Sequence, residues 1–69
     1  MTLIVTRKYH LPNGGYCLGD TEADITKYKA NDVYFHPKHL TIYNSDNRSR
    51  SELNLPLDTY NYNYQIRED

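Results

Sequence analysis

Three histidines and a single cysteine are the side chains in this 69-residue sequence best suited to bind a metal or act as a nucleophile. His36 and His39 are three positions apart, whereas His10 and Cys17 lie well upstream. This spacing matches no zinc finger or ribbon, because Cys17 has no second cysteine nearby. No nucleophile signature surrounds it either. The sequence therefore predicts no metal, no cofactor and no catalytic residue, and indicates that His36 and His39 are turn or sheet-surface residues.

Three carboxylates form the next cluster, at Asp20, Glu22 and Asp24. They would hold a cation only if a loop wrapped around it. At the start of a helix, negative charge is already favoured by the backbone dipole. We therefore interpret these residues as solvated charges at a helix start, available to a basic patch on a partner.

Two arginines, Arg48 and Arg50, lie in a polar stretch and could bind the phosphates of a nucleic acid. Bases would then stack on the tyrosines of residues 58–67, as in proteins that bind single strands along a sheet. However, 8 basic residues stand against 9 acidic ones, so the basic excess typical of phosphate binding is missing. Single-stranded nucleic-acid binding is therefore kept as the alternative function, and nucleic acid is an unlikely partner.

The elements that must position these residues begin with a predicted β-hairpin. Residues 2–10 are rich in β-branched and aromatic types, and the stretch LPNGG follows. Pro12 suits the second position of a type I turn, and Gly14 suits the left-handed position that completes a three-residue loop with a bulge. The strand is expected to return through residues 16–20, with Cys17 on the face opposite to that of Tyr16 and Leu18.

A short amphipathic helix is predicted for residues 21–30. Asp20 or Thr21 can cap its first turn. Ile25 and Tyr28 are three apart and would form its buried stripe. A loop is the alternative for this segment.

The remainder of the chain indicates extended structure. The alternation of apolar and polar residues predicts two short strands around Pro37, either as a hairpin or as one bent edge strand. The segments expected here are strands at 32–36 and 39–43, a long polar loop at 44–52, an extended edge segment at 53–57 and a closing strand at 58–67. Together with the helix, they predict an α+β fold: one small domain spanning residues 1–69, with an antiparallel sheet of three to five strands. An all-β meander or small barrel is the alternative.

Eight tyrosines are unusual in a chain of this length. In the closing strand, Tyr60, Tyr62 and Tyr64 share one face, and we interpret them as a cover for the core beneath the helix, with their hydroxyls at the rim. Tyr34 and Tyr43 alternate with apolar residues instead. If those apolar residues face inward, the Tyr34 and Tyr43 rings face outward.

Composition narrows the class of protein. The mass of 8.2 kDa and the net charge of -1 suit a small soluble domain. A lone Cys17 cannot form an internal disulfide, so a reducing cytoplasm is the expected location. No apolar stretch has the length of a signal peptide or a membrane span, so no membrane partner is expected.

The sequence thus predicts a protein-binding module rather than an enzyme. In size, near-neutral charge and lack of a catalytic motif it resembles the small inhibitors that bacteriophages and mobile elements encode against host machinery, anti-CRISPR proteins among them. That resemblance implies steric occlusion of a larger protein or complex, and it carries over no residue roles. From the residues themselves, we expect the docking face to include Tyr34 and Tyr43, with Asp20, Glu22 and Asp24 meeting a basic patch. Pairing of strand edges into a homodimer is a second route to association.

Overall fold

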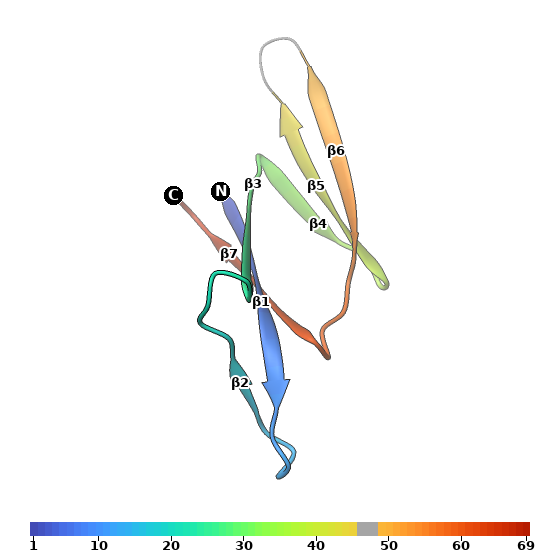
Figure 1. Cartoon of the computed structure of the whole chain (residues 1–69). Helices are drawn as coiled ribbons and strands as arrows, with labels where there is room; N and C mark the ends of the chain where they lie inside the picture. Colours follow the sequence, from blue (N-terminus) through green and yellow to red (C-terminus); the bar gives the residue numbers. More distant parts are fainter. Residues whose placement is uncertain (46–48) are drawn as a thin grey trace.

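The computed structural model describes residues 1–45 and 49–69, and in that part of the chain the secondary structure is entirely β. Two small antiparallel sheets are formed (Figure 1). Their strands are β1 (Thr2–His10), β2 (Tyr16–Leu18), β3 (Ile25–Lys29), β4 (Asp32–Phe35), β5 (His39–Ser45), β6 (Arg50–Pro56) and β7 (Tyr62–Arg67). In the described residues, no helix has the length and apolarity that crossing a membrane requires.

The first sheet is built around β1. Strand β7 pairs with one edge of β1, while β3 and β2 follow one another along the other edge. Arg7 shows that β2 and β3 share an edge: its N–H donates to the Asp24 carbonyl (2.9 Å), and its own carbonyl accepts from the Gly19 N–H (2.9 Å). Both groups of one strand residue point to the same side. Residues 19–24 therefore form a loop whose two ends both hydrogen-bond to Arg7 of β1.

The predicted N-terminal hairpin is confirmed, although its returning strand ends at Leu18 rather than at residue 20. The Gly14 N–H donates to the Leu11 carbonyl (3.1 Å), and the Leu11 N–H donates to the Gly15 carbonyl (2.8 Å). Gly14 has a φ of 89°, the left-handed conformation expected of it. Tyr9 pairs with Cys17, which places Cys17 on the opposite face from Tyr16 and Leu18, as predicted.

The predicted helix at residues 21–30, and with it the α+β class, is wrong. A capping turn does form, since the Asp24 N–H donates to the Thr21 carbonyl (3.0 Å), but it ends there. Ile25 to Lys29 instead form β3, paired with Thr2 to Thr6 of β1. A single i, i+3 apolar pair stabilises a short helix only weakly, so the ladder with β1 prevails. The all-β class named as the alternative is the correct one.

The second sheet has the order β4-β5-β6. A hairpin across Pro37 joins β4 to β5, the first of the two arrangements expected from the sequence, with the His36 N–H donating to the His39 carbonyl (2.8 Å). The predicted loop at 44–52 was too long, because β5 continues to Ser45 and β6 begins at Arg50. Arg48 lies outside the described residues.

The core lies where the two sheets meet. Leu3 of β1, Leu40 and Ile42 of β5, and Ala30 in the link between β3 and β4 are its buried apolar side chains. This core is small for the chain, and the molecule is elongated, with extents of 50 × 25 × 18 Å.

The tyrosines near the C-terminal end do not act as one strip. Tyr64 packs against the core, Tyr62 is 37% exposed, and Tyr60 lies before β7 in a turn at 69% exposure. The Asp58 carboxylate accepts the Asn61 N–H (3.1 Å) in that turn. The interpretation of the strip as a core cover therefore holds for Tyr64 alone, and the predicted closing strand begins at Tyr62 rather than at residue 58.

Candidate functional site

Two tyrosine rings stand together on the solvent face of the second sheet. Tyr34 on β4 and Tyr43 on β5 meet edge to face, with ring centroids 5.4 Å apart and an interplanar angle of 83°. Their neighbours Val33 and Ile42 are a cross-strand pair on the core side. Tyr34 is 53% exposed, and Tyr43 is half-buried. The predicted outward orientation of both rings is confirmed.

A buried polar residue fixes the sheet beneath this pair. Thr41 lies directly across from Tyr34 and is 2% exposed. Its hydroxyl donates to Oδ1 of Asn54 on β6 (2.7 Å) and lies 3.3 Å from Nε2 of His36. The His36 ring in turn stacks on His39, at 4.2 Å between centroids. Side chains thus join β5 to β6 and to the turn that follows β4, in addition to the backbone ladder, so the surface above them is preformed.

Charged residues of the second sheet surround Tyr43. The Arg50 guanidinium lies over its ring, 4.8 Å from the centroid. Asp32 and Glu52 are the residues directly opposite Tyr43 on the two neighbouring strands. We name this group, made of Tyr34, Tyr43, Arg50, Asp32 and Glu52, the tyrosine face. The sequence prediction missed the last three members because it placed residues 44–52 in a loop and read Asp32 only as a strand start.

The predicted acidic cluster lies elsewhere, in the segment that links β2 to β3. Figure 1 shows this segment well apart from β4 and β5. Asp24 is engaged within the fold, since its carboxylate accepts hydrogen bonds from the Tyr9 hydroxyl and from the Thr21 hydroxyl (2.6 Å). The structure therefore does not bring Asp20, Glu22 and Asp24 together with the tyrosine face.

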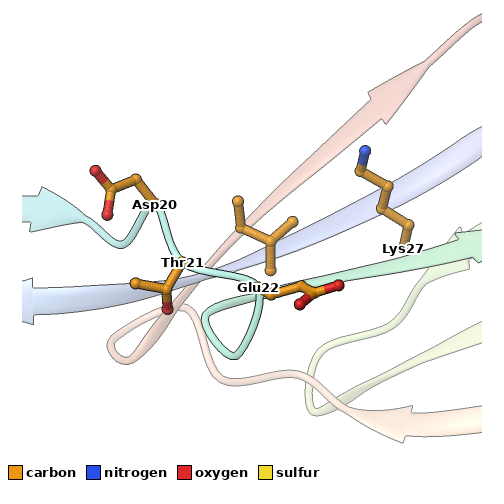
Figure 2. A pocket seen from close by; sticks show the side chains of 5 residues that line it. Asp20, Thr21, Glu22 and Lys27 are labelled. Carbon is orange, nitrogen blue, oxygen red and sulfur yellow. The ribbon is translucent and has the colours of Figure 1, made fainter.

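Asp20 and Glu22 line an open groove of about 480 Å³ (Figure 2). Thr21, Ile25 and Lys27 complete its lining. Figure 2 shows Asp20 and Lys27 at opposite ends of the groove, so its charge is mixed. Its charged side chains are exposed and of both signs, and none of its lining residues is a buried polar group that could hold a ligand.

The three histidines and the cysteine do not form one group, because the stacked His36 and His39 belong to the second sheet, whereas His10 and Cys17 lie in the first. His10 stacks on Tyr60 (4.1 Å between centroids), and its Nε2–H donates to the Tyr60 carbonyl (2.7 Å). Cys17 is exposed on β2, on the sheet face opposite to His10. Within residues 1–45 and 49–69, no group of three or more His, Cys, Asp or Glu side chains is arranged to hold a metal ion.

Hydrogen bonding lowers the pKa of three aspartates. Bonds from Thr21 and then Tyr9 lower the pKa of Asp24, the Asn61 side chain lowers that of Asp58, and bonds from Thr2 and Lys29 lower that of Asp69. The same contact with Asp24 raises the pKa of the Tyr9 hydroxyl.

These shifts predict acid sensitivity. A carboxylate with a lowered folded-state pKa stabilises the fold above its unfolded pKa of about 4, and this contribution is lost as the pH falls through the folded value. We expect the melting temperature to drop between pH 5 and pH 2, as followed by circular dichroism. Asp58→Asn should flatten this dependence, because it removes a carboxylate whose pKa is lowered by the Asn61 hydrogen bonds. An unchanged melting temperature down to pH 2 would contradict this assignment.

Comparison with known proteins adds no relative: no protein-family model, no curated protein and no solved structure matches this chain.

Proposed function

We propose that this chain is a non-enzymatic protein-binding module that acts by covering a surface of a larger protein. The observation that carries the proposal is the tyrosine face, where an exposed and a half-buried tyrosine ring meet edge to face beside an arginine, on a sheet in which the Thr41–Asn54 hydrogen bond joins β5 to β6. Tyrosine and arginine are among the residues that contribute most to binding at protein interfaces. A preformed surface also loses little entropy when a partner docks.

The charges of the tyrosine face favour a protein over a nucleic acid. Asp32 and Glu52 stand on both sides of Tyr43, and among the described residues of this face Arg50 alone carries a positive charge. Carboxylates beside the aromatic rings repel the phosphates of a nucleic acid, whereas they complement a basic patch on a protein. The acidic contribution to docking, first expected from Asp20, Glu22 and Asp24, is therefore assigned to Asp32 and Glu52.

Such a module inhibits by steric occlusion. At 8.2 kDa and 50 Å in length, it is large enough to block a nucleic-acid groove or a subunit contact without a catalytic step. This mode of action is that of the small anti-defence inhibitors of bacteriophages and mobile elements, which the chain resembles in size and charge. A reducing cytoplasm is the compartment that suits the free, exposed thiol of Cys17.

The double variant Tyr34→Ala/Tyr43→Ala tests this proposal. Truncation of an interface tyrosine commonly costs about 2 kcal/mol or more, roughly 30-fold in affinity, so a partner captured from the native cell by the wild type should be lost. The loss of the ring contact itself costs only about 0.5–1.5 kcal/mol, and the melting temperature should fall by a few degrees.

Tyr16→Ala is the matched control, because Tyr16 is 51% exposed but lies on the other sheet. It should leave capture unchanged. A collapsed melt in the double variant would show that the rings are structural. Salt-sensitive binding of a single-stranded oligonucleotide by the wild type would instead favour the alternative function.

A further inference from the structure

The outer edge of β7 is open. Among the strands of the described residues, β7 pairs with β1 alone, and the Lys8 N–H donates to the Asn61 carbonyl (2.8 Å). In this register the backbone groups of Asn63 and Gln65 face β1, so those of Tyr64 and Ile66 point away from it. Within the described residues, no backbone group pairs with these outward ones.

The other edges carry features that discourage pairing. Strand β2 has three residues, and β4 has four and is followed shortly by Pro37. Strand β3 displays Lys27 and Lys29, and β6 ends at Pro56. Lysine, proline and short length are the usual protections of an exposed edge. Strand β7 has six residues without proline or glycine, and its single charge is at Arg67.

The molecule also exposes more surface than its mass requires. A compact monomer of this mass exposes about 4,500 Å², whereas this chain exposes 5321 Å². The radius of gyration is 13.7 Å, against about 11 Å for a compact domain of this length. The excess area, about 800 Å², equals what each partner buries in a standard protein complex. Ile66, beside the open backbone groups, is 41% exposed.

We propose that two copies of this chain pair through β7, antiparallel and related by a two-fold axis at Gln65. This register sets the free backbone groups of Tyr64 opposite those of Ile66 in the second copy. The Ile66 side chain then packs beside the second copy's Tyr64, and the two Gln65 amides face each other on the other side of the sheet.

The ends of the strand are compatible with this arrangement. Arg67 lies opposite Asn63 of the second copy, and Glu68 lies opposite Tyr62, so no like charges meet. The edge closes at Tyr62, whose N–H already donates to the Asp58 carbonyl (3.0 Å). The dimer leaves both tyrosine faces unused, and it goes beyond the proposed function without depending on it.

Cross-linking tests the register directly, in a Cys17→Ser background that removes the native thiol. Gln65 would face itself as a non-hydrogen-bonded pair with Cα atoms about 4.5 Å apart, within the range that a disulfide spans. The Gln65→Cys protein should therefore form a disulfide-linked dimer under mild oxidation. Asn63→Cys is the matched control, because the two copies of residue 63 would be displaced by about 13 Å along the strands. We expect roughly tenfold more cross-linked dimer from Gln65→Cys, and equal amounts from both variants would overturn the proposal.

Sedimentation equilibrium tests the association itself. The mass should rise from 8.2 kDa toward twice that value as the wild-type concentration increases from micromolar to near-millimolar. Ile66→Lys should shift this rise to at least tenfold higher concentration, because it places a charge on the pairing edge. The Tyr34→Ala/Tyr43→Ala protein should dimerise as the wild type does, which separates this result from that of the capture experiment. A single 8.2 kDa species over the whole range would overturn the proposal.

Discussion

Replacing Leu40 with alanine is expected to lower the free energy of unfolding by about 2–5 kcal/mol. The Leu40 side chain is fully buried at the centre of the second sheet, where it pairs with Phe35 on β4 and with Leu55 on β6. The truncation removes its transfer free energy and leaves a cavity that this thin core can close only in part. A domain of this length has about 3–10 kcal/mol of stability in total, so much of the Leu40→Ala protein should be unfolded at 37 °C. Urea titration followed by circular dichroism measures the change.

Leu53→Ala provides the matched control. Leu53 lies on the same side of the same sheet, paired with Ile42, but it is 46% exposed. The identical substitution should therefore cost about 1 kcal/mol or less, because about half of the side chain is already in water. Equal losses from the two variants would contradict a core centred on Leu40.

The two hairpins were predictable because their signals are local. In LPNGG, one proline and one glycine specify the turn, and the structure places Gly14 in the conformation that this turn requires. Pro37 marks the second hairpin in the same way. By contrast, nothing in residues 62–67 identifies β1 as their partner, since pairing across nearly the whole chain depends on which apolar faces pack together.

The incorrect helix prediction for residues 21–30 shows the limit of local sequence signals. A turn does form where the helix was expected to start, since the Thr21 hydroxyl donates to the Asp24 carboxylate (2.6 Å) and the Asp24 N–H donates to the Thr21 carbonyl (3.0 Å). A single turn does not extend a helix, however. Ile25 and Tyr28 face opposite sides of the sheet in β3, and Tyr28 pairs with the buried Leu3. Burial against β1 thus decided the structure of a segment whose own helical preference was weak.

The candidate site was predictable only where the local alternation of side chains along a strand decides it. Alternation along β4 and β5 placed Tyr34 and Tyr43 outward, because a side chain's face in a strand follows from its position alone. The position of Arg50 over Tyr43 depends on β6 lying beside β5. The polar sequence around residue 50 does not indicate that strand. In β6, Arg50, Glu52 and Asn54 lie on the same side of the sheet as Tyr43, and the less polar residues between them lie on the other side.

Tyr64 is expected to be the one tyrosine near the C-terminal end on which stability depends. Its ring lies 6.4 Å from that of Phe35, edge to face, and packs against the core. Its hydroxyl accepts the Asp58 N–H (3.1 Å) and lies 3.4 Å from the Pro56 carbonyl. Tyr64 therefore joins the first sheet to the second and to the turn that connects them. Tyr64→Ala should cost about 2–4 kcal/mol, because the side chain is largely but not fully buried.

Two further variants separate the ring of Tyr64 from its hydroxyl and from its position on β7. Tyr64→Phe keeps the ring and should cost only about 1 kcal/mol, the usual net value of a hydrogen bond. Tyr62→Ala alters the same face of the same strand at a half-solvated ring and should cost about 1 kcal/mol, which urea titration at low micromolar concentration measures without a contribution from dimerisation. If Tyr62→Ala proved as damaging as Tyr64→Ala, the tyrosines would cover the core together. The expected difference would show that core packing depends on Tyr64. The other side chains of β7 would then be free to lie at the open edge where a second copy is proposed to pair.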